Sequence, residues 1–259
     1  CVFYKTDLMN CLAETLTDNG FSFFPFNNRG ANLIKKLDRK LPDGTKERVL
    51  YGMTYEIIKD CVIDIDGAIE YLTSLGYNEI YLVGSSTGAN KICVYNWYKP
   101  QNRIKGYLLL SGGDDTGIYY SQELGPKKFC HALEKCRSKI DQGKGMKLAM
   151  DFISYQSLYD TLNPDGDYNT FPFYETLFNV KLSKKKLFRE FASIQKPSLV
   201  VYGEIDEYCY GKVSEIVKLL KKKVSDIHNF TFHVIPEGDH SFNGKEKELV
   251  EVIIKWLQR

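Results

Sequence analysis

Three side chains in separate motifs could together perform nucleophilic catalysis. The segment Gly84-Ser85-Ser86-Thr87-Gly88 fits the pattern G-x-S-x-G, and Asp206 and His240 follow it much later in the chain. A serine hydroxyl is a weak nucleophile until a base removes its proton and a third group orients that base. The types and order of these residues predict Ser86 as the nucleophile, His240 as its base and Asp206 as the acid that orients His240.

The elements around Ser86 are those that a nucleophile elbow requires. A β-rich run over Glu79–Val83 precedes the motif, and a helical pattern from Ser86 to Tyr98 follows it. This arrangement leaves the serine exposed at a tight turn, where glycines 84 and 88 allow close backbone approach. The backbone N–H of Thr87, at the start of the helix, is the predicted oxyanion donor.

The proposed acid and base each follow a predicted strand. Asp206 comes after the apolar run Ser198–Gly203, and His240 comes after Phe230–Ile235. Because the carboxyl ends of parallel strands meet at one edge of a sheet, these side chains should lie near Ser86. Asp114 or Asp115, after the strand predicted at Lys105–Ser111, is an alternative orienting acid. Asp239 is expected to stabilise its turn.

The remaining pattern indicates an α/β protein. Strands that alternate with helices predict a mostly parallel, doubly wound sheet, since parallel strands need crossover connections. A further short strand is predicted at Phe21–Phe26, whereas Leu33–Gly52 has no sustained period and is interpreted as an excursion over the surface. The other predicted helices lie near Leu8–Leu16, from Thr54 to Leu75, at Val213–Val224 and at Glu246–Leu257.

A segment rich in Tyr and Phe separates the two α/β portions. We interpret residues 114–196 as an inserted, mainly helical lid, and residues 1–113 with 197–259 as the core. Eight of its aromatic residues could line an acyl pocket or simply pack together: Tyr119, Tyr120, Phe152, Tyr155, Tyr159, Phe171, Phe173 and Tyr174. The basic triplets at 184–186 and 221–223 are interpreted as solvated faces.

Composition limits the possible partners and compartments. The 35 basic and 33 acidic residues among 259 give a net charge of +2, which points to neither nucleic acid nor an anionic membrane. The apolar runs are too short to span a bilayer, and no secretory signal precedes Leu8, so we expect a cytoplasmic protein without a membrane span.

The seven cysteines are scattered singly, which favours reduced thiols. Cys130, His131 and Cys136 lack a second pair at zinc-site spacing, so no metal or organic cofactor is expected.

From about Tyr4 to its end, the chain resembles the α/β-hydrolase fold superfamily. The resemblance rests on the elbow at 83–88, Asn28-Arg29-Gly30, Tyr202–Glu207 and Gly238-Asp239-His240. It implies a carboxylic ester hydrolase that acts on a small acyl ester through an acyl-enzyme. The motifs at 143–145 and 163–167 are similar to those of a branch that includes fungal siderophore esterases.

The sequence departs from this superfamily at its beginning. Such hydrolases place a His-Gly-type loop after their third strand, and here the helix that should follow that loop begins almost at residue 1. We therefore expect the N-terminal strands to be missing from the sequence, with upstream residues or another segment filling the gap. The second oxyanion donor, the oligomeric state and the choice of ester, thioester or amide stay open. A thioesterase, peptidase, acyltransferase or catalytically silent binding protein of the same fold is the alternative.

Overall fold

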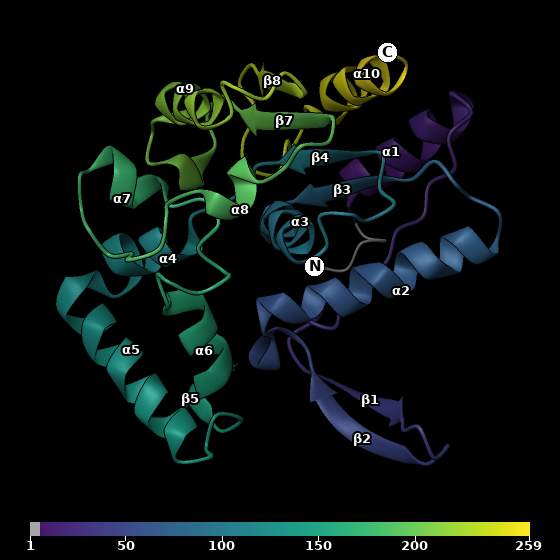
Figure 1. Cartoon of the computed structure of the whole chain (residues 1–259). Helices are drawn as coiled ribbons and strands as arrows, with labels where there is room; N and C mark the ends of the chain where they lie inside the picture. The colour runs from purple at the N-terminus through teal and green to yellow at the C-terminus, as the bar shows by residue number, and fades with distance from the viewer. Residues whose placement is uncertain (1–5) are drawn as a thin grey trace.

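A computed structural model describes residues 6–259 and centres on a parallel sheet (Figure 1). Its strand order is β3-β4-β7-β8, and every neighbouring pair is parallel. The strands are β3 (Tyr81–Ser85), β4 (Gly106–Leu110), β7 (Ser198–Gly203) and β8 (Phe230–Ile235). These four strands lie within two residues of their predicted bounds, because each is a short apolar run closed by glycine or by a polar turn.

Helices cover both faces of this sheet (Figure 1). On one face, α1 (Asp7–Asp18) and α10 (Glu246–Leu257) pack their leucines and isoleucines against β4 and β7. On the other face lie α2 (Cys61–Ser74), α3 (Thr87–Tyr98) and α9 (Val213–Lys223). The predicted doubly wound α/β architecture is confirmed.

The strand predicted at Phe21–Phe26 is wrong. These residues follow α1 but form no strand ladder, and Phe24 packs instead against Tyr71 of α2 with 5.6 Å between ring centroids. Within residues 6–259, no strand pairs with the outer edge of β3. A strand requires a hydrogen-bonded partner, which an aromatic sequence run cannot supply alone.

The excursion predicted at Leu33–Gly52 is a β-hairpin. Strand β1 (Lys35–Lys40) pairs antiparallel with β2 (Lys46–Tyr51), and Gly44 has a φ of +85° in the connecting turn. The hairpin projects from the body (Figure 1). Most of its side chains are exposed and many are charged, so the alternation of a half-buried strand is missing from the sequence.

The long helix begins later than predicted. Thr54 lies in a 3-10 turn, η2 (Met53–Tyr55), and its hydroxyl donates to the Leu33 carbonyl rather than capping a helix. A second turn, η3 (Ile58–Asp60), starts where the Ile58 N–H donates to Asp160 Oδ2 at 2.7 Å. These long-range contacts outweigh the helical period, and α2 starts only at Cys61.

The segment 114–196, here called the insertion, contains five α-helices and a small hairpin. One part, built around α5 and α6, has its own apolar cluster that includes Phe129, Leu158 and Leu162. The elements of the whole insertion are α4 (Asp115–Ile118), the π-helical turn η4 (Tyr119–Glu123), α5 (Gly125–Asp141), β5 (Leu148–Met150), β6 (Ile153–Ser154), α6 (Tyr155–Leu162), α7 (Phe173–Leu177) and α8 (Arg189–Ala192).

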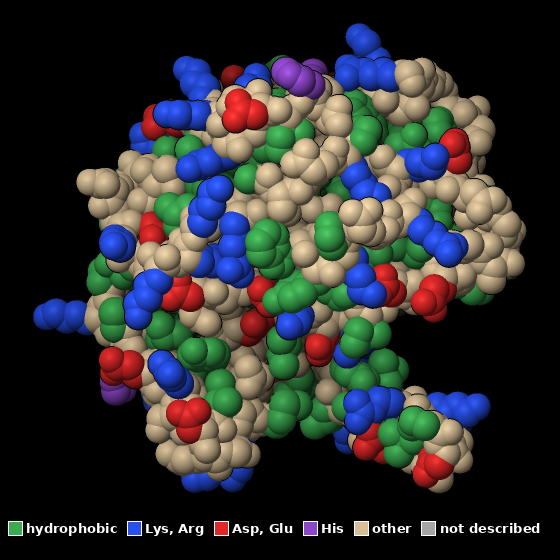
Figure 2. Space-filling view, viewed as in Figure 1, with side chains coloured by type: hydrophobic (Ala, Val, Ile, Leu, Met, Phe, Trp, Pro, Cys, Tyr) green, Lys and Arg blue, Asp and Glu red, His purple; other side chains and the backbone are tan. Residues whose placement is uncertain are grey.

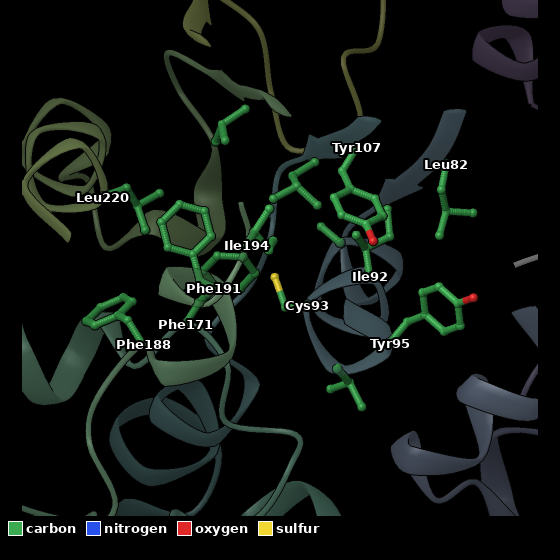
Figure 3. Close-up of a cluster of buried hydrophobic side chains, with 14 of the residues drawn as sticks. Leu82, Ile92, Cys93, Tyr95, Tyr107, Phe171, Phe188, Phe191, Ile194 and Leu220 are labelled. Carbon is green, nitrogen blue, oxygen red and sulfur yellow. The ribbon is translucent and has the colours of Figure 1, made fainter. Parts of the chain in front are cut away.

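The later part of the insertion belongs to the main core. Phe171, Phe188 and Phe191 pack between Cys93 of α3 and Leu220 of α9 (Figure 3). The insertion is therefore anchored to the sheet by its second half, and the division of the chain at residues 113 and 197 stays a prediction.

One basic triplet is not a solvated face. The side chain of Lys185 is only 5% exposed, and its Nζ lies 3.1 Å from Oε1 of the fully buried Glu190. The backbone N–H groups of Lys184 and Lys185 donate to Asp165 in the predicted turn at 163–167. The prediction for 184–186 is wrong at Lys185 because a carboxylate four residues beyond the triplet turns inward.

The six cysteines in the described residues are free thiols, and four of them are buried: Cys61, Cys93, Cys136 and Cys209. Cys1 lies outside those residues. Over residues 6–259, none of the helices is both long enough and apolar enough to cross a membrane.

Candidate active site

The elbow at Ser86 joins β3 to α3. Ser86 has φ of 55° and ψ of −129°, a strained conformation that turns the chain sharply between strand and helix. A Cβ on Gly84 would lie 2.3 Å from the Gly88 carbonyl oxygen, so only glycine fits where the chain folds back. A Cβ on Gly88 would meet no atom within 4 Å, and the close approach predicted for both glycines is therefore needed only at Gly84.

The loops after β7 and β8 bring the other two side chains to the same edge. A Cβ on Gly203 would lie 2.2 Å from the Gly238 carbonyl oxygen, so the two loops can touch only because this residue is glycine. The Ile205 N–H donates to the Gly238 carbonyl at 2.9 Å, which fixes the loops to each other.

Ser86, His240 and Asp206 form one hydrogen-bonded chain. His240 Nε2 lies 2.9 Å from Ser86 Oγ, and His240 Nδ1 lies 3.0 Å from each carboxylate oxygen of Asp206. Asp206 is only 2% exposed, and its Oδ1 also accepts from the Tyr208 N–H. A carboxylate held this way fixes the tautomer whose Nε2 can accept the serine proton.

The surroundings of His240 favour its protonated form. Burial lowers the pKa of the imidazole, but the hydrogen bond and charge of Asp206, with the charges of Glu207 and Asp115, outweigh burial and raise the pKa above 6.5. The Tyr208 ring packs edge-on against the imidazole, with 4.6 Å between centroids. The Glu207 carboxylate also accepts from the backbone N–H of His240 at 3.0 Å.

The alternative acids lie elsewhere in the same region. Asp114 accepts from the N–H groups of Gly117 and Tyr174, so its carboxylate caps α4 and holds the insertion. Burial raises the pKa of Asp114 to about 7 and that of Asp115 to about 6. The structure brings Asp206, and neither Asp114 nor Asp115, to His240 Nδ1. Asp239 accepts from the Ser241 N–H in its own turn, as expected.

Thr87 is the first residue of α3, so its N–H has no acceptor within the helix and is free for a developing oxyanion. The helix dipole adds a partial positive charge at this end. The second donor was expected before α1, in a region that lies outside the described residues.

The sequence analysis missed several polar side chains that lie near the site. Lys91, on the buried side of α3, forms an ion pair with Glu56, and both side chains are nearly buried. Tyr168, from the insertion, lies close to Thr87, Asp115 and Glu56. Lys91 is the one charged residue of α3, which was the available signal for it, whereas no local pattern marks Tyr168 or Glu56.

The eight aromatic residues of the insertion do not support a shared acyl pocket. Phe171 and Phe173 are buried in the main core, and Tyr119, Tyr120, Tyr155 and Tyr159 pack on the cluster around α5 and α6. A cavity of about 650 Å³ lies instead beside residues 95–103, at the end of α3 opposite Ser86. Twelve helical residues, or about 18 Å of helix, separate that end from the elbow.

Known proteins share this arrangement of elements. Residues 16–258 match the family model described as a protein of unknown function, DUF1749. The chain belongs to the DUF1749 family. Solved structures of esterases share the fold of this chain, and the predicted resemblance is confirmed at the level of the α/β-hydrolase fold. The curated proteins include no match to the chain.

Several solved structures share this architecture at low sequence identity. Est1E from Butyrivibrio proteoclasticus is 15% identical, with a TM-score of 0.57 over 98% of this chain and 81% of its own. The esterase EaEST from Exiguobacterium antarcticum is 13% identical, with a TM-score of 0.55 over 98% and 87%. The monoacylglycerol lipase of Paleococcus ferrophilus is 16% identical, with a TM-score of 0.54 over 95% and 88%. At these identities the likeness establishes the α/β-hydrolase fold alone.

Proposed function

We propose that this member of the DUF1749 family is a serine hydrolase that cleaves a carboxylic ester. The observation that carries the proposal is the hydrogen-bonded chain from Asp206 through His240 to Ser86, at the carboxyl edge of the sheet. The esterases and the lipase among the structural neighbours agree with this class of reaction. The narrower resemblance to siderophore esterases stays a prediction.

The geometry supports a two-stage mechanism. His240 takes the proton of Ser86 while Oγ forms a bond to the acyl carbon, and the Thr87 N–H stabilises the oxyanion. The carbon–oxygen bond to the alcohol then breaks, and His240 returns the proton to the departing alcohol. Water, activated by His240, attacks the acyl-enzyme and releases the acid and free Ser86.

Labelling with a fluorophosphonate probe tests the activated serine. The intact protein should react in a time-dependent manner at neutral pH, and Ser86→Ala should remove the label completely. His240→Ala should slow labelling about 10⁴-fold or more, since the hydroxyl then lacks its base. A folded protein that carries no label would contradict the proposal and favour a catalytically silent binding protein.

Chromogenic esters and thioesters of graded acyl length then define the substrate. Turnover of short acyl esters above that of matched thioesters and amides would support a carboxylesterase. Preferential turnover of thioesters or amides would retain the triad but overturn the assignment of an ester substrate.

A further inference from the structure

Exposed apolar side chains concentrate on two neighbouring projections of the molecule. One is the hairpin with η2, and the other is the end of the insertion that carries β5. Eight large side chains there are 43–54% exposed, and we call them the apolar rim: Leu33, Ile34, Leu37, Met53, Met146, Leu148, Met150 and Phe152. The rim includes three of the four methionines of the protein, whose flexible side chains suit an adaptable contact.

The two projections meet at η2. The Met53 N–H donates to the Asn32 carbonyl at 2.8 Å, which ties η2 to the start of the hairpin. The Ser157 hydroxyl donates to the Met53 carbonyl at 3.1 Å, which ties η2 to the insertion. In Figure 1 the hairpin and the β5 end both lie at the lower side of the molecule, and hydrophobic side chains gather between them in Figure 2.

The two segments that carry the apolar rim are also basic. Residues 33–53 and 144–152 together hold eight basic and four acidic side chains, a net charge of +4 in a chain whose net charge is +2. Arg39 and Arg48 pair with acids within the hairpin. Within the described residues, Lys35 and Lys36 form no ion pair, and they directly precede Leu37 in β1.

We propose that the apolar rim docks the protein on an anionic lipid surface. Apolar side chains surrounded by lysines enter the boundary between headgroups and acyl chains, while the lysines attract the lipid phosphates. Binding of a second copy of the chain to this surface is disfavoured, because the two segments carry a net charge of +4 in each copy and would repel each other. A fluid surface can also cover two separate projections that form no single rigid groove.

The rim is connected to the candidate active site. Glu56, three residues after Met53, pairs with Lys91 on the helix that begins at the elbow. Docking through the rim would therefore bring a segment that contacts α3 to a surface of lipid esters. This relation to lipid esters rests on the proposed function, whereas the docking itself does not.

Vesicle flotation with the full chain tests the docking. Vesicles of phosphatidylcholine with phosphatidylserine should bind the protein at least about tenfold better than phosphatidylcholine alone, and salt should weaken that binding. Lys35→Glu with Lys36→Glu, and separately Met150→Ser with Phe152→Ser, should each reduce binding about tenfold.

Matched controls change the same residue types elsewhere. Ile63→Ser with Leu75→Ser alters exposed apolar side chains in α2 and at its C-cap, and Lys218→Glu with Lys222→Glu alters exposed lysines of α9. Both controls should bind vesicles as the parent protein does, and thermal unfolding should verify that every variant folds.

Three outcomes would overturn the docking. The first is equal binding by the rim variants and the controls, and the second is no preference for phosphatidylserine. The third is a dimer in sedimentation that the rim substitutions dissociate, with no vesicle binding, which would assign the rim to a second copy. Ser86→Ala should bind vesicles normally, so loss of hydrolysis and loss of docking are distinguishable.

Discussion

Gly84 and Gly88 flank the same serine, but only one of them has no room for a side chain. A methyl group on Gly84 would overlap the Gly88 carbonyl oxygen, at 2.3 Å, and would push the elbow out of place. Gly84→Ala should therefore lower both the melting temperature and the rate of fluorophosphonate labelling, with a cost of about 1–3 kcal/mol in stability.

Gly88→Ala is the matched control for Gly84→Ala. Its Cβ would meet no atom within 4 Å, and alanine in a helix is favoured over glycine by about 0.5–1 kcal/mol. Stability should be maintained or raised and labelling retained. If both substitutions have the same effect, the close approach at Gly84 does not position the elbow.

The raised pKa of His240 sets the pH dependence of the proposed reaction. Only neutral His240 can accept the Ser86 proton, so the rate of labelling should rise with pH and reach half its plateau above pH 6.5. Asp206→Asn removes the hydrogen-bonded charge that raises this pKa. It should shift the midpoint to lower pH and lower the plateau about 10⁴-fold.

Glu207→Gln separates charge from contact in the same experiment. Glutamine can still accept from the backbone N–H of His240, but it lacks the charge that helps to raise the pKa of the imidazole. A smaller downward shift with a near-normal plateau is expected. A midpoint that moves upward in either variant would contradict this account of His240.

At the scale of elements, a buried ion pair links the loop before α8 to that helix. Glu190 is fully buried and accepts from Lys185 and Arg189 through the same oxygen, Oε1. Lys185→Met would leave this carboxylate undercompensated and should lower the free energy of unfolding by about 3 kcal/mol. Urea unfolding measures the change.

Two further variants complete this test. Lys186→Met, at the exposed neighbouring position, should leave stability nearly unchanged. Adding Glu190→Gln to Lys185→Met removes the buried charge and should recover part of the lost stability. Full additivity of the two substitutions would show that the pair is not coupled.

At the scale of the whole molecule, β3 lies at the edge of the parallel sheet. The backbone groups of alternate residues in β3 therefore differ in whether they face a partner strand. The Ile80 carbonyl accepts from the Lys105 N–H, and the Ser86 N–H donates to the Leu110 carbonyl. The backbone groups of Leu82 and Gly84 therefore point toward β4. Tyr81 and Val83 direct their backbone groups outward, and Val83 is 38% exposed.

Hydrogen exchange should therefore alternate along β3. The Val83 amide is expected to exchange at least about tenfold faster than Leu82, whereas Leu109 in the doubly paired β4 is protected. Strong protection of both Tyr81 and Val83 would mean that another segment pairs with this edge.

Local sequence already predicted the four strands of the parallel sheet and the candidate triad. The runs at 198–203 and 230–235 are apolar and closed by turn residues, and G-x-S-x-G joins a strand to a helix, so each signal lies within a few neighbouring residues. The expected proximity of Ser86, Asp206 and His240 then followed from placing these strands in one parallel sheet.

Only the tertiary structure decided features that depend on distant partners. Phe21–Phe26 forms no ladder without a neighbouring strand, and α2 starts late because Ile58 binds Asp160. Lys185 is buried because Glu190 turns toward it, and the insertion's aromatics divide between two cores. In each case a tertiary contact outweighs local propensity, and no local pattern in one sequence encodes that contact.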